Sequence, residues 1–139
     1  MDKHFDIIVV GCGPTGAIAS LLLAQKGLQV AIVEQHQNVY PHPRAIALNG
    51  FSMGLIKELL QDLWSEFEYT TAVEVGYVLS KDKMNEPFGK MQPPIIEGKI
   101  LDLDHYGFLN WFNQPQLERL LRKKIESTKN IQTYFNYTT

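Results

Sequence analysis

The chain has 139 residues, enough for one domain of ordinary size, and 45% of them are hydrophobic, as in a globular protein. Its net charge of -2 provides no broad basic surface, which argues against nucleic acid as a partner, and its single cysteine excludes a disulfide framework and any paired-cysteine redox or zinc motif. The apolar run at residues 7–10 is too short for a signal peptide or a membrane span, so we expect a cytoplasmic protein.

The segment DIIVVGCGPTGAIASLLLAQKGLQVAIVEQ, residues 6–35, predicts a strand, a tight turn, a helix and a second strand. Residues 7–10 form an uninterrupted β-branched run, typical of a strand covered on both faces. The helix is expected to end near Gly27, and LQVAIVE to form a second buried strand. This is a βαβ unit with a right-handed crossover.

The turn carries the pattern Gly11-x-Gly13-x-x-Gly16, in which each glycine has its own task. Gly11 allows the tight turn, Gly13 allows the backbone to approach a pyrophosphate, and Gly16 allows the helix to pack on the sheet. Phosphates are favoured at the N-terminus of a helix. The pattern therefore predicts a dinucleotide site, with a glycine turn that binds nothing as the alternative.

Glu34 ends the second strand, 23 residues after Gly11. A carboxylate there can accept hydrogen bonds from both ribose hydroxyls, and it repels a 2′-phosphate. Gln35 supplies no cation to offset that repulsion, which argues against NADP at this site. We interpret Cys12, inside the motif, as a small packed residue, although a helix N-terminus can lower a thiol pKa and make it reactive.

Several further elements are expected after Glu34. Residues 35–50 are polar and contain two prolines, which predicts a loop. A second amphipathic helix is marked by Phe51, Leu55, Leu59 and Leu63, with Ile56 and Leu60 beside them. A half-exposed strand is indicated by the alternation of Val73, Val75, Tyr77 and Leu79, with a short return strand near residues 88–91. A third helix opens at Asn113 or Gln114 with Pro115, its inner face formed by Leu117, Leu120, Leu121 and Ile125, and a final strand has Ile131, Thr133 and Phe135 facing inward.

Other polar and aromatic residues suggest no chemistry. The four histidines, His4, His36, His42 and His105, have no metal-ligand spacing. Asp102 and Asp104 lack a partner that would indicate a role, and Trp111 and Phe112 are expected to belong to the core.

Two later segments, PRAIALN at residues 43–49 and FNQPQLERLL at 112–121, carry a family resemblance. With the glycine motif and Glu34, they make nearly the whole chain similar to the N-terminal part of the flavin-dependent aromatic hydroxylases. The resemblance is strongest to the 3-(3-hydroxyphenyl)propionate hydroxylase branch and more distant to p-hydroxybenzoate hydroxylase.

The resemblance implies an α/β, Rossmann-like FAD-binding fold of the p-hydroxybenzoate hydroxylase type. It places Arg44 beside the cofactor and Gln114 near the ribityl and pyrophosphate groups; a solvated loop cation and a helix cap are the respective alternatives. The expected cofactor-binding residues are Gly11, Gly13, Pro14, Thr15, Gly16, Glu34, Gln35, Arg44 and Gln114. No metal ligand and no catalytic residue is assigned.

The resemblance also implies that the chain is an incomplete N-terminal portion. Residues 1–71 would be the first part of the FAD-binding domain, residues 72–100 the start of a substrate-domain excursion, and residues 101–139 the continuation of the FAD-binding domain. The later Gly-Asp segment of the family is absent from this sequence. We therefore expect these residues alone to bind FAD weakly and to show no turnover.

The function implied is the FAD-binding segment of an NAD(P)H-dependent monooxygenase that hydroxylates a phenolic compound. Three alternatives remain open: an FAD oxidoreductase of the same superfamily that does not hydroxylate, an NAD-binding dehydrogenase module, and a non-catalytic remnant. The expected partner is a small aromatic substrate, and the sequence leaves the oligomeric state undetermined.

Overall fold

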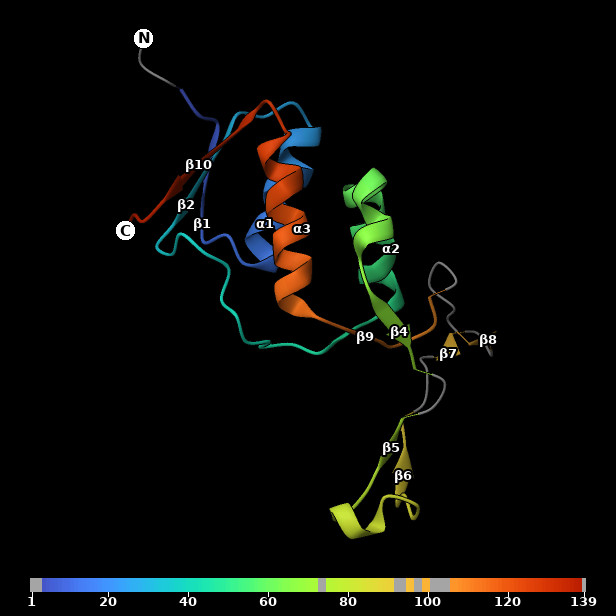
Figure 1. The fold of residues 1–139 in the computed structure, drawn as a ribbon. Helices are drawn as coiled ribbons and strands as arrows, with labels where there is room; N and C mark the ends of the chain where they lie inside the picture. The colour runs from blue at the N-terminus through green and yellow to red at the C-terminus, as the bar shows by residue number, and fades with distance from the viewer. Residues whose placement is uncertain (1–3, 73–74, 92–94, 97–98, 101–105, 139) are drawn as a thin grey trace.

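A parallel three-stranded sheet forms one side of the molecule in the computed structural model, which describes residues 4–72, 75–91, 95–96, 99–100 and 106–138 (Figure 1). Its strands are β1 (Ile7–Val10), β2 (Val30–Glu34) and β10 (Ile131–Phe135), in the order β1-β2-β10. Because all three strands are parallel, their carboxyl ends meet at one edge of the sheet. The predicted βαβ unit and the predicted final strand are confirmed.

Two helices, α1 (Pro14–Gln25) and α3 (Gln114–Glu126), pack against each other on one face of this sheet (Figure 1). Asn113 caps α3, because its side-chain Oδ1 accepts a hydrogen bond from the backbone N–H of Gln116 (3.2 Å). The predicted inner face of α3 is confirmed, since all its members are buried: Leu117, Leu120, Leu121 and Ile125. They form a continuous core with Leu21 of α1 and with Val30 and Ile32 of β2.

The opposite face of β1 has no cover among the described residues. Ile8 and Val10 are 64% and 65% exposed, whereas Val9 packs against the core. The prediction that β1 is covered on both faces is therefore wrong. A β-branched run favours a strand whatever covers it, and here the helices lie on one face only. The prediction holds for the central strand β2, whose first three residues are buried.

The second amphipathic helix differs from its prediction in length and in orientation. Helix α2 (Gly50–Leu60) is followed by the 3₁₀-helix η1 (Gln61–Glu66), so the α-helical period stops before Leu63. The side chain of Asn49 caps α2 by accepting a hydrogen bond from Ser52 N–H (2.8 Å). The buried face consists of Met53, Ile56, Leu59 and Leu60, so Phe51 falls on the outer side and is 61% exposed.

A small antiparallel sheet joins the middle of the chain to the start of α3. Its strands are β3 (Ala47–Leu48), β9 (Asn110–Phe112) and β4 (Tyr69–Thr71), in the order β3-β9-β4. The buried side chain of Asn110 links them: its Oδ1 accepts from the Thr71 hydroxyl (2.8 Å), and its Nδ2 donates to the Leu48 carbonyl (3.4 Å). Phe112 packs against the core as expected, but Trp111 is 39% exposed.

A hairpin of β5 (Gly76–Tyr77) and β6 (Gly89–Lys90) extends away from the helices, with the 3₁₀-helix η2 (Lys81–Lys83) in its turn (Figure 1). The return strand is confirmed as β6. The predicted strand is present as the short β5, but its half-exposed character is wrong, because Tyr77, Val78 and Leu79 are all exposed and define no inner face. Val73 and Glu74 lie outside the described residues. A further pair, β7 (Ile95–Ile96) and β8 (Lys99–Ile100), follows. The division at residues 72 and 100 stays a prediction.

Among the described residues, no helix combines the length and the apolar character that crossing a membrane requires.

We predict that Met53→Ala destabilises the fold by about 2–5 kcal/mol, because it leaves a cavity in the core. Phe51→Ala, two residues earlier in the same helix, should change the free energy of unfolding by no more than about 0.5 kcal/mol, since the ring is exposed. Urea unfolding of both variants measures the difference. Equal losses would show that α2 is rotated relative to the orientation described here.

Candidate functional site

The turn between β1 and α1 lies at the carboxyl edge of the parallel sheet. Gly11 has a φ of +97°, a conformation that favours glycine, and its N–H donates to the Val33 carbonyl (2.7 Å). Pro14 is the first residue of α1, where its missing N–H removes no hydrogen bond. The first-turn N–H groups of Thr15 and Gly16 have no intrahelical acceptor, as in any α-helix, so they are available to a ligand at this end.

The three glycines of the turn are required for different physical reasons. A Cβ at Gly16 would press on the Gly11 carbonyl, 3.1 Å from its carbon, so close packing of the helix on the turn requires glycine there. Gly13 has ordinary extended backbone (φ −73°, ψ −177°), and a Cβ there would meet no protein atom within 4 Å. Neither conformation nor packing accounts for Gly13. The open space in front of it is what the close approach of a pyrophosphate would need.

Glu34, the last residue of β2, bridges the glycine turn and the loop that follows the strand. One carboxylate oxygen accepts the backbone N–H of Cys12 and the other accepts the backbone N–H of His36, both at 2.8 Å. Burial alone would raise its pKa, but these two hydrogen bonds and the charges of Arg122 and His36 hold the pKa of Glu34 below its ordinary value. The carboxylate is therefore ionised at neutral pH, and each oxygen keeps a lone pair for another donor.

Cys12 is a packed residue, as interpreted from the sequence. The thiol is buried in the core cluster with 1% exposure. Burial raises the pKa of Cys12, as do the charges of Glu34 and Glu118, against an opposing effect of Arg122. A protonated, inaccessible thiol is a poor nucleophile, so the alternative of a reactive cysteine is not supported.

Gln114 fastens the loop carrying Arg44 to the start of α3. Its side-chain Oε1 accepts the backbone N–H groups of Arg44 (2.8 Å) and Ala45 (2.6 Å), and its Nε2 donates to Glu118 Oε1 (2.7 Å). Gln114 is not the helix cap, because Asn113 holds that position. The Arg44 guanidinium lies over the Tyr40 ring, 4.6 Å from its centroid.

A cleft of about 140 Å³ brings most of the predicted site residues together. Its lining includes Gly13, Pro14, Glu34, Gln35, Arg44 and Gln114. Gly11 lies outside this lining but lines a neighbouring hollow, whereas Thr15 and Gly16 line neither of the two. Positively charged Arg44 faces the same space as the N-terminal end of α1. The cleft thus combines hydrogen-bond donors and positive charge for phosphates with a carboxylate for sugar hydroxyls.

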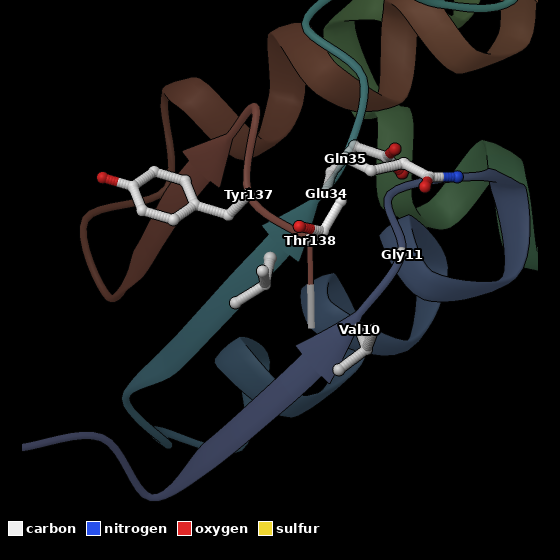
Figure 2. Close-up of a pocket in the computed structure, with 7 residues that line it drawn as sticks. Val10, Gly11, Glu34, Gln35, Tyr137 and Thr138 are labelled. Carbon is white, nitrogen blue, oxygen red and sulfur yellow. The ribbon is translucent and has the colours of Figure 1, made fainter.

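The neighbouring hollow, of about 340 Å³, opens at the ends of β1, β2 and β10 (Figure 2). Val10, Gly11, Val33, Glu34, Gln35, Tyr137 and Thr138 line it. Tyr137 and Thr138 were missed from the sequence, although the backbone N–H of Tyr137 donates to the Glu34 carbonyl (3.2 Å). The available signal was the predicted final strand at 131–135. If that strand pairs in parallel with the strand ending at Glu34, the residues after it lie beside Glu34.

Glu118 and Arg122 of α3 also line the 140 Å³ cleft and were missed. Arg122 Nη1 donates to the Gln37 carbonyl (2.8 Å), and the guanidinium lies 4.8 Å from the Phe135 ring centroid. Both residues follow Gln114 at helical spacing, which was a usable signal. No group of metal-ligating side chains occurs in the part of the chain that the structure describes. Asp102, Asp104 and His105 lie outside that part.

The model of the FAD binding domain family matches residues 4–139. This chain belongs to that family. The fold, the cofactor and the resemblance stated from the sequence are confirmed by this match. A probable NADH-specific resorcinol 4-hydroxylase from Rhodococcus jostii (strain RHA1) is 35% identical over 137 residues, which cover 94% of this chain and 23% of that protein.

Two solved structures share the fold. The p-nitrophenol 4-monooxygenase PnpA from Pseudomonas putida DLL-E4 superposes with a TM-score of 0.70 at 20% identity, over 98% of this chain and 33% of that one. A ternary complex of aklavinone-11 hydroxylase with FAD and aklavinone gives a TM-score of 0.66 at 19% identity, over 98% and 26% of the two chains. The chain spans no more than about a quarter of the curated relative and a third of these structures.

We predict that Gly13→Ala weakens FAD binding about tenfold or more without lowering thermal stability, because the added methyl enters open space that a pyrophosphate needs. Gly16→Ala is the matched comparison: it should lower the melting temperature, since its methyl meets the Gly11 carbonyl. Flavin titration and thermal unfolding separate the two effects. A stable Gly13→Ala variant with normal flavin affinity would contradict the assignment.

A second prediction concerns the loss of folding stability at acidic pH. The folded-state pKa of Glu34 lies below its ordinary value, so folding favours the ionised form. This contribution to stability is fully present above the ordinary value of 4.5 and is lost as pH falls through the lower folded-state pKa. Glu34→Gln should therefore flatten the dependence of the urea midpoint on pH below 4.5. An unchanged acid slope would contradict the two backbone hydrogen bonds.

Proposed function

We propose that this chain supplies the dinucleotide-binding part of a flavin-dependent monooxygenase that uses NAD(P)H to hydroxylate a small phenolic compound. The observation that carries the proposal is the convergence of Gly13, Glu34 and Arg44 on one cleft at the carboxyl edge of the parallel sheet. The family match and the similarity to the aromatic hydroxylases named above support it. A cytoplasmic location remains a prediction of the sequence.

Each part of FAD has a chemically suited counterpart in this proposal. Glu34 accepts hydrogen bonds from the adenosine ribose, and its negative charge disfavours a ribose carrying a 2′-phosphate. The N-terminal end of α1 and the open backbone at Gly13 receive the diphosphate. Arg44 provides a planar set of donors for diphosphate or flavin oxygens. The hollow beside Tyr137 and Thr138, lined partly by valines, suits the adenine ring.

The residues of this chain bind and orient the cofactor; none is assigned as a catalytic acid or base. When bound, FAD supplies the redox chemistry, accepting electrons from the nicotinamide and activating oxygen. The protein contributes by fixing one end of the cofactor. Glu34 and the glycine turn adjoin elements that pack into the core, and the Arg44 loop is fastened to α3 by Gln114.

We predict that Glu34→Ala weakens FAD binding by about 1.5–3 kcal/mol, or about ten- to a hundredfold, because it removes charge-assisted bonds to the ribose. Glu58→Ala, which removes an exposed carboxylate on α2, is the matched control and should leave affinity unchanged. Fluorescence titration with FAD measures both. If the two variants bind alike, Glu34 is not the ribose ligand.

The activity itself is tested in a full-length protein that carries this segment, by NAD(P)H oxidation with a panel of phenolic acids. Product analysis should show one oxygen atom added to the ring for each nicotinamide consumed. Flavin reduction without a hydroxylated product from any phenol would favour the alternative of a non-hydroxylating flavoprotein. Binding of NADH with no affinity for FAD would favour the dehydrogenase alternative.

A further inference from the structure

A buried carboxylate, Glu118, lines the cleft proposed for an anionic cofactor. It lies one turn after Gln114 on α3, and both side chains are 7% exposed. Its carboxylate accepts a hydrogen bond from Gln114 Nε2, at 2.7 Å. A negative charge in the wall of a diphosphate site repels the ligand and costs desolvation energy. An apolar side chain would fill the same volume without either cost. The presence of a carboxylate bonded to Gln114 therefore calls for an explanation.

That hydrogen bond determines which way the Gln114 amide faces. A glutamine side chain has an oxygen that only accepts and a nitrogen that only donates. Glu118 Oε1 accepts a hydrogen bond from Gln114 Nε2, so it holds the nitrogen of Gln114 on its side. The oxygen is thereby turned toward the loop, where it accepts two backbone N–H groups, those of Arg44 and Ala45. In the flipped orientation, these two backbone donors would face an NH₂ group and lose their acceptor.

We propose that Glu118 is a positioning residue for cofactor binding: by orienting the Gln114 amide, it holds the backbone of Arg44 and so places the Arg44 guanidinium in the cleft. This inference rests on the proposed function of the cleft. Glu118 acts through Gln114 on a loop 70 residues away in sequence, and the N-terminal turn of α3 thereby controls the arginine of the 35–46 loop. Arg122, one turn later on the same helix, also lines the cleft.

A double-mutant cycle on FAD affinity tests the proposal. Glu118→Met should weaken FAD binding about tenfold, the value of one lost hydrogen bond that leaves the amide free to rotate. Glu118→Gln keeps an oxygen that can accept from Gln114 Nε2, so it should restore affinity to within about threefold of the original. In an Arg44→Met background, Glu118→Met should cause little further loss, because the residue that it positions is gone.

A control and a second readout separate positioning from general damage to the fold. Glu126→Gln removes an exposed charge at the other end of α3 and should leave affinity unchanged. Amide hydrogen exchange without flavin should show faster exchange at Arg44 and Ala45 in Glu118→Met, while the core amides of β2 stay protected.

Three results would overturn the inference. Equal losses from Glu118→Met with and without Arg44 would show that Glu118 does not act through Arg44. Tighter FAD binding by Glu118→Met would show that charge repulsion outweighs positioning. Unchanged exchange at Arg44 and Ala45 would show that the amide of Gln114 needs no orienting partner. A protein that binds no FAD before mutation would instead contradict the proposed function.

Discussion

The carboxylate of Glu34 is the contact on which the geometry of the cleft depends. It accepts one N–H from the glycine turn after β1 and one from the loop after β2, so it joins the two segments that leave adjacent parallel strands. Both hydrogen bonds favour the ionised form, and both hold backbone that has no ladder partner beyond the end of the sheet. The backbone of the glycine turn and of the following loop is therefore held in place without a ligand.

A second set of hydrogen bonds joins the loop after β2 to helix α3, which lies much farther along the sequence. Gln114 takes hold of the loop after β2 at Arg44 and Ala45, and Glu118 holds Gln114. These contacts use backbone N–H groups, so they position the loop without depending on the side chains that it carries. The packing of α3 against α1 in turn places Gln114 beside the glycine turn. One helix therefore supports both the core and the cleft.

The three glycines of the turn are the same residue type, but each position is explained by a different physical cause. Gly11 is set by its positive φ, and Gly16 by contact with the carbonyl of Gly11. Gly13 has neither reason within the protein, and the open space beside it is what the proposed cofactor would need. This difference separates a residue kept for folding from one that the proposed cofactor would require, even though the motif treats the three alike.

The sequence by itself determined the βαβ unit, the glycine turn, the position of Glu34 at the end of β2, and the start and inner face of α3. These features follow from local periodicity, caps and turn chemistry, which act over a few residues.

Only the tertiary structure decided which faces are covered. Ile8 and Val10 are exposed because the helices pack on one side of β1, and Phe51 faces outward because α2 packs its opposite side into the core. The same holds for Tyr137, which reaches the neighbouring hollow because β10 lies parallel to β2, and for Glu118 and Arg122, which reach the cleft because α3 packs beside α1. Contacts between residues a hundred positions apart depend on strand order and helix packing, and no local pattern in the chain encodes either one.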